Sequence, residues 1–150
     1  MIKGEIYTDK INAAMTKAIN NGLKAACIMV EGQAVNLVPV DDGRLKGSIT
    51  WKTNSERGGG GLKTPVDKNQ GIVGTNVEYA PYVEYGTGIY AEEGNGRTTP
   101  WVYKYEGKKG PKGWRWTVGQ KPQSYLRKAL DIRRKDIVKY FKTAFDRALK

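Results

Sequence analysis

Paired carboxylates are the first groups in this sequence that could do chemistry. Asp41 lies next to Asp42, and Glu92 lies next to Glu93. Such pairs can hold Ca²⁺ or Mg²⁺, or divide acid and base roles between them. Neither pair has the spacing of a calcium-binding loop. We therefore interpret Asp41 and Asp42 as turn or capping residues, and Glu92 and Glu93 as solvated loop charges.

The sequence contains no His and a single Cys, Cys27. This excludes Ser-His-Asp triads, Cys–His dyads, His-ligated zinc and intrachain disulfides. Cys27 falls on the apolar side of a helical pattern without a basic neighbour, so we expect a buried structural thiol. No nucleophile–base motif is present, and the sequence predicts neither an enzyme nor a bound cofactor or metal.

Four consecutive glycines, Gly58, Gly59, Gly60 and Gly61, could cradle a phosphate. The Lys-Ser/Thr pair of a phosphate-binding loop does not follow them at the required spacing. The surrounding polar sequence, ERGGGGLKTPVDKNQ, is typical of a flexible connection. It predicts a mobile loop tip that becomes ordered when it docks on a partner protein.

Aromatic and basic residues are interleaved between residues 101 and 116. Trp101, Tyr103 and Tyr105 alternate before the turn-forming GKKGPKG, and Trp114 and Trp116 alternate after it. This predicts a hairpin stabilised by cross-strand aromatic pairs. Trp, Tyr and Arg are enriched in protein interfaces, so we expect Trp101, Trp114 and Trp116 to dock a partner. Cations beside aromatic rings also suit nucleic acid, and a nucleic-acid-binding hairpin is the alternative.

The chain is strongly basic. Its 150 residues include 26 Lys and Arg against 15 Asp and Glu, for a net charge of +11. Such a surface favours an acidic protein partner or nucleic acid. No apolar run approaches the roughly 18 residues of a membrane span, and the N-terminus lacks the apolar stretch of a signal peptide. We therefore expect a soluble protein made in the cytosol.

These groups must be positioned by a small set of elements. Apolar residues at spacings of three and four predict helices over residues 8–37 and 124–149, the first bent at Asn20, Asn21 and Gly22. Ser124 is the expected cap of the second helix. Strands are predicted over residues 48–53 and 71–77, paired as a hairpin, and a single helical turn begins at Pro81.

Together these elements predict one α+β domain over residues 1–150. A long N-terminal helix and a C-terminal helix pack an antiparallel β-sheet, with extended loops. Residues 89–121 form an inserted, basic and aromatic hairpin region.

Two motifs carry a resemblance to a known family. VPVDDGRLKGSI spans residues 38–49, and VGTNVEYAPYVEYGTG spans residues 73–88. In this order, between an N-terminal and a closing helix, they resemble the minor tail-component family of tailed bacteriophages, small neck or tail-completion proteins. The resemblance extends over essentially the whole chain. The motif residues are Asp42, Gly43, Arg44, Leu45, Ser48, Tyr79, Ala80, Glu84, Gly86 and Thr87.

Each motif makes a structural prediction. Gly43 is expected to take a backbone angle that other residues resist, in a sharp turn after Asp42. Arg44 is predicted to pair with Glu84 and so to join the two motifs. Tyr79 and Ala80 are expected to pack the short helix on the sheet, and Gly86 with Thr87 to end it.

The resemblance implies a structural virion protein at the head–tail junction of a tailed phage. Such a protein completes or terminates the tail or forms a neck ring. It implies partners among other neck and tail proteins: the connector or stopper, and the tail tube or terminator. It also implies a homo-oligomer such as a hexameric ring, passing contact with genomic DNA, assembly in the host cytoplasm and no membrane association.

Overall fold

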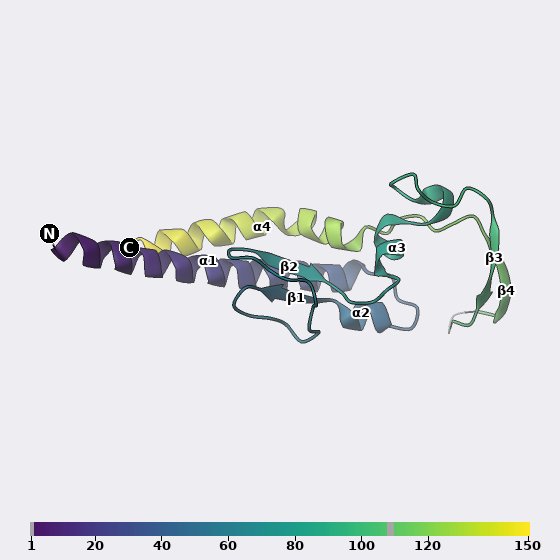
Figure 1. Ribbon diagram of the computed structural model, residues 1–150, viewed down its shortest axis with the longest axis horizontal. Helices are drawn as coiled ribbons and strands as arrows, with labels where there is room; N and C mark the ends of the chain where they lie inside the picture. Colours follow the sequence, from purple (N-terminus) through teal and green to yellow (C-terminus); the bar gives the residue numbers. More distant parts are fainter. Residues whose placement is uncertain (1, 108–109) are drawn as a thin grey trace.

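Two long antiparallel helices form the body of the molecule, and a β-hairpin projects from one end (Figure 1). The computed structural model describes residues 2–107 and 110–150. α1 (Ile2–Leu37) and α4 (Tyr125–Ala148) lie side by side along the long axis. The predicted α+β class is confirmed, with a long N-terminal and a C-terminal helix.

α1 is longer and straighter than predicted. It begins at Ile2 rather than at residue 8, and it continues through Asn20, Asn21 and Gly22 as one element without a visible bend (Figure 1). A Cβ atom at Gly22 would overlap the ring of Phe141 on α4. The glycine therefore permits close helix–helix approach, and the predicted bend is wrong.

The core lies where α1 meets the start of α4 and the short elements between them. Ala34 of α1 and both Tyr125 and Ala129 of α4 are completely buried. Cys27 is buried on α1, as predicted. The buried cluster consists of Val30, Ala34, Val38, Leu45, Ile49, Val77, Ala80, Val83, Tyr125 and Ala129.

A short helix and a two-stranded sheet follow α1. α2 (Arg44–Ser48) leads into β1 (Thr50–Thr53), which pairs antiparallel with β2 (Gly71–Gly74), and Trp51 faces Val73. Both strands are shorter than predicted. Ser48 ends α2 instead of beginning the strand. Beyond β2 the Thr75 hydroxyl hydrogen-bonds the Ser48 hydroxyl at 2.6 Å and accepts the Val77 N–H at 3.0 Å, which ends the ladder.

The glycine run lies against β1 instead of projecting as a free tip. The Gly58 N–H donates to the Trp51 carbonyl at 2.8 Å, and the Gly60 N–H donates to Thr50 Oγ1 at 3.2 Å. A Cβ atom at Gly58 would lie 2.7 Å from Thr50 Oγ1, and one at Gly60 would lie 2.7 Å from Thr50 Cγ2. Close backbone approach, rather than mobility, therefore accounts for glycine at these two positions.

The remaining elements connect the sheet to α4. α3 (Ala80–Tyr85) is followed by η1 (Gly88–Tyr90), then by β3 (Trp101–Tyr105) and β4 (Gly113–Thr117). β3 and β4 form a second antiparallel sheet, separate from that of β1 and β2, in the region predicted as an inserted hairpin. The predicted turn includes residues 108–109, which lie outside the described residues. Within the described chain no helix combines the length and apolarity needed to cross a bilayer.

Candidate docking site: an anchored hairpin arm

We call the hairpin of β3 and β4 the arm. Its register pairs Val102 with Trp116 and Lys104 with Trp114. Directly opposed residues of an antiparallel pair share a face, so these four side chains form one face of the arm, the tryptophan face. Trp101, Tyr103, Tyr105, Arg115 and Thr117 form the other, the tyrosine face. The predicted hairpin is confirmed, but its cross-strand aromatic pairs are wrong because the tryptophans of β4 and the aromatics of β3 lie on opposite faces.

The aromatic rings of the tyrosine face make cation–π contacts with arginines. The Arg115 guanidinium lies 3.7 Å from the centre of the Tyr105 ring and donates to the Pro111 carbonyl at 2.8 Å. The Arg97 guanidinium lies 5.6 Å from the centre of the Trp101 ring. Cation–π contacts of this kind contribute about 0.5–1 kcal/mol each at exposed sites. Trp101 therefore belongs to the packing of the arm itself.

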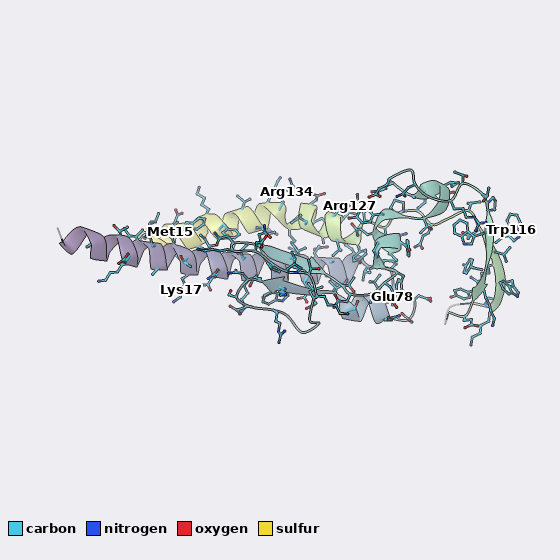
Figure 2. The ribbon with its side chains drawn as sticks, in the orientation of Figure 1. Met15, Lys17, Glu78, Trp116, Arg127 and Arg134 are labelled. Carbon is cyan, nitrogen blue, oxygen red and sulfur yellow. The ribbon has the colours of Figure 1, made fainter. Side chains whose placement is uncertain are left out.

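The tryptophan face is open to solvent. Trp114 is 74% exposed and Trp116 is 76% exposed, and Val102 of β3 is 48% exposed. Figure 2 shows Trp116 at the far end of the molecule, pointing away from the helices. Large exposed apolar side chains gathered on one face are typical of interaction sites. Of the three tryptophans predicted to dock a partner, Trp114 and Trp116 are brought together and Trp101 is turned away from them.

The root of the arm is held by Gly86 and Thr87 of the second motif. The Thr87 N–H donates to the Gln120 carbonyl at 2.9 Å, and the Gln120 N–H donates to Thr87 Oγ1 at 2.9 Å. Gly86 ends α3 at φ +80°, as predicted. Gly119 has φ +129°, and a Cβ atom there would overlap the Thr87 carbonyl. The segments that precede and follow the arm thus pack backbone to backbone at its root.

Glu84 attaches α3 to α4 beneath this root. It is 3% exposed, and its carboxylate accepts the backbone N–H groups of Leu126 at 2.9 Å and of Arg127 at 3.2 Å. It therefore caps the N-terminus of α4, a place where negative charge is stabilised. Ser124 precedes α4 at φ +50° without a side-chain cap bond, so the predicted cap is wrong and Glu84 takes its role.

Arg127 joins three segments at this point. Its Nε lies 3.0 Å from Glu84 Oε1, and its two terminal nitrogens lie 2.7 and 2.9 Å from the carboxylate of Glu92. The same side chain lies over the ring of Tyr85 at 4.9 Å. Figure 2 places Arg127 at the end of α4 that faces α3. We call Glu84, Arg127 and Glu92 the anchor.

The anchor shifts the pKa values of Glu92 and Arg127. Hydrogen bonds from Arg127 hold the pKa of Glu92 below its usual value. The same bonds, together with those to Glu84, raise the pKa of Arg127. Beside the anchor, burial above all and then the charge of Glu84 raise the pKa of Tyr125 to about 12. Its hydroxyl has no hydrogen-bond partner among the described residues.

Arg44 does not reach Glu84, so the predicted pair is wrong. It pairs with Glu78 at 3.0 Å, and both side chains are more than half exposed. Its guanidinium also lies 5.8 Å from the centre of the Tyr79 ring. A backbone hydrogen bond, followed by the bond from Arg44, lowers the pKa of Glu78. The two motifs still meet, but through the neighbouring glutamate, because Glu84 faces α4.

The other motif residues form the junction between the two motifs. Gly43 has φ +86°, as predicted, and Asp42 accepts the Arg44 N–H at 2.9 Å in the same turn. Leu45 and Ala80 are buried in the core. Tyr79 occupies the position before α3, and Ser48 contacts Thr75. These residues act in the fold that carries the arm.

The arm root borders a cavity of about 570 Å³ lined by Tyr82, Tyr85 and Trp101 among others. Of its two carboxylates, Glu92 is held by Arg127, and Glu93 accepts a hydrogen bond from Asn95 at 3.2 Å. The described residues contain no group of three or more His, Cys, Asp or Glu that could hold a metal.

Residues 7–86 match the family model described as "Bacteriophage HK97-gp10, putative tail-component". This is more than half of the chain. The chain belongs to this family. Membership in the HK97-gp10-like family supports a structural tail protein of a phage, part of the virion, with other tail proteins as its partners. No curated protein and no solved structure shows a significant match.

The family match is narrower than the predicted resemblance over the whole chain. It ends at Gly86, so it includes both motifs up to the end of α3. The arm and α4 lie beyond it. The anchor crosses this boundary, because Glu84 lies within the matched part and Arg127 and Glu92 lie outside it.

Sequence reasoning missed Arg127, Glu92 and Gln120 as partners of the second motif. One signal was available for Glu84. Glu84 stands four residues after Ala80 and one after Val83, on the buried face of α3. A carboxylate buried on an apolar helix face requires a hydrogen-bonding or charged partner, and Arg127 near the start of α4 supplies one.

Proposed function

We propose that this HK97-gp10-like protein acts at the head–tail junction, where it completes or terminates the tail or forms a neck ring. The observation that carries the proposal is the arm. It is rooted by backbone contacts at Gly86, Thr87 and Gly119 and held by the anchor, yet it offers Trp114 and Trp116 to solvent. A hairpin with a preformed root and an exposed aromatic face suits docking, because less conformational entropy is lost on binding.

The proposed partners are the proteins on either side of such a ring: the connector or stopper towards the head, and the tail tube or terminator towards the tail. Assembly takes place in the host cytoplasm, and the protein itself forms a homo-oligomer such as a hexameric ring, with passing contact with genomic DNA. The role is structural rather than catalytic. Gly58, Gly59, Gly60 and Gly61 remain a predicted second docking segment, although Gly58 and Gly60 are hydrogen-bonded to β1.

A phage with the gene inactivated provides the test. We expect electron microscopy of the lysate to show filled heads and tails that are not joined, and joining to be restored by adding the purified protein. Normal joined particles without the protein would refute the role. Light scattering over a concentration series would show a discrete ring-sized species, and a monomer at every concentration would refute self-assembly in the absence of partners.

The alternative function is nucleic-acid binding by the basic arm. It predicts submicromolar affinity for DNA with a steep dependence on salt, because each phosphate contact releases counterions. A fluorescence titration with duplex and single-stranded DNA over a salt series measures both quantities. Binding weaker than micromolar at physiological salt would exclude a dedicated DNA site.

A further inference from the structure

The two faces of the arm differ in how their polar groups are used. On the tyrosine face Arg115 is stacked on Tyr105 and bonded to the Pro111 carbonyl, and Arg97 at the base of the arm is stacked on Trp101. Among the described strand residues of the tryptophan face the cation is Lys104, which pairs with Glu106 at 2.7 Å. The centre of the tryptophan face therefore consists of Val102, Trp114 and Trp116.

This separation disfavours DNA as the ligand of the tryptophan face. A DNA-binding surface makes several phosphate contacts, and arginines beside the aromatic groups are the usual donors. Here both arginines are directed to the tyrosine side. An apolar aromatic centre with few charges, surrounded by polar residues, is instead the composition of the energetically dominant part of a protein–protein interface.

The charge around the arm indicates what kind of protein fits. Residues 97–121 contain seven Lys and Arg and one Glu. An acidic surface would be attracted to this region, whereas the same basic region of a second copy would be repelled from it. We propose that the tryptophan face docks Trp114 and Trp116 into apolar pockets on an acidic protein of the same virion. This inference rests on the proposed function, and it adds the class of partner.

The arm is already shaped for this contact. The segments at its root are joined by the Thr87–Gln120 hydrogen bonds, and the Ile89 N–H donates to the Val118 carbonyl at 3.0 Å. Because the root is preformed, burial of the two indole rings is not offset by the entropy of ordering a loop. Each tryptophan is therefore expected to act as a dominant contact.

Photo-crosslinking in the virion tests the inference. Trp116 is replaced by p-benzoylphenylalanine, which keeps a large aromatic group, and the matched control carries it at Tyr103 on the opposite face. We expect Trp116 to give a cross-link to another virion protein at a segment rich in Asp and Glu, and Tyr103 to give little. A cross-link to DNA, to a second copy of this chain, or no excess over Tyr103 would overturn the inference.

The affinity of the protein for the purified cross-linked partner provides a quantitative test. W114A and W116A should each weaken binding by about 30-fold or more, the level typical of dominant interface tryptophans. Y103A should weaken it by less than about threefold, and added salt should weaken binding of the unchanged protein. Equal losses for W116A and Y103A would overturn the inference.

The proposed function is tested separately from the class of partner. Mass spectrometry of purified virions shows whether the chain is present. If it is present but the cross-link pattern fails, the partner class is wrong and the structural role stands. If it is absent, both are wrong.

Discussion

Replacement of Glu84 should destabilise the whole domain, because this buried carboxylate joins α3 to the start of α4. Its carboxylate caps α4 through the N–H groups of Leu126 and Arg127 and receives the Arg127 side chain at 3.0 Å. Loss of a helix cap costs about 1 kcal/mol. Loss of a hydrogen bond to a charged group costs about 1.5–3 kcal/mol. Because Arg127 keeps Glu92, we expect E84A to lower the free energy of unfolding by about 3 kcal/mol.

Urea unfolding followed by circular dichroism measures this effect. With a denaturant slope of about 2 kcal/mol/M, the midpoint should fall by about 1.5 M for E84A. E84Q keeps the size of the side chain but directs an amide N–H₂ at backbone donors, and it should lose about half as much. The matched control is Glu93→Ala, since Glu93 is exposed nine residues further along the chain. It should stay within about 0.5 kcal/mol of the unchanged protein.

The reasoning would be refuted if E84A unfolded at the same urea concentration as E93A. Hydrogen exchange gives a second, local readout. The amides of Leu126 and Arg127 should exchange faster in E84Q than in the unchanged protein, because their acceptor is weakened. Unchanged exchange at both amides would show that the carboxylate does not cap α4.

Four further predictions concern single groups. G119A should cost about 1–3 kcal/mol of strain at the arm root and speed exchange of the Gln120 amide, whereas G59A, with open space around it, should not. Y125F should leave stability unchanged or raise it by about 1 kcal/mol, because the buried hydroxyl has no partner among the described residues; a clear loss would reveal a bound water. Cys27, whose pKa burial raises to about 11, should react with thiol reagents at pH 8 only after unfolding. The pKa of Glu92 measured by NMR should lie below its ordinary value of 4.5. Because this pKa is lowered in the folded state, Glu92 stabilises the fold at pH values above 4.5, and this contribution is lost as the pH falls through the folded-state pKa.

The sequence was most informative where local patterns decide the structure. Apolar spacing predicts α1 and α4, and the Gly43 turn follows from the need for a positive φ after Asp42. Alternation also predicts both strands of the arm. It does not determine how the strands are paired, because a shift of one residue reverses which side chains share a face. The observed register separates the tryptophans of β4 from the aromatic residues of β3.

Long-range partners were the part that the sequence could not supply. Glu78 and Glu84 both lie within the second motif, and only the orientation of α3 decides that Arg44 meets Glu78 and that Arg127 meets Glu84. Likewise, the glycines at positions 58 and 60 are equally compatible with mobility and with close packing on Thr50. The helical spacing of Glu84 with Ala80 was the one local sign of the anchor.

The location of the chain in the particle tests the account most directly. Purified virions would be separated into heads and tails, and the chain would be quantified in each fraction by mass spectrometry. The account predicts that the chain is retained in the particle, at the tail fraction or the joint, in a small fixed number of copies such as six. A chain that is abundant in the lysate but absent from purified virions would contradict a structural role in the tail.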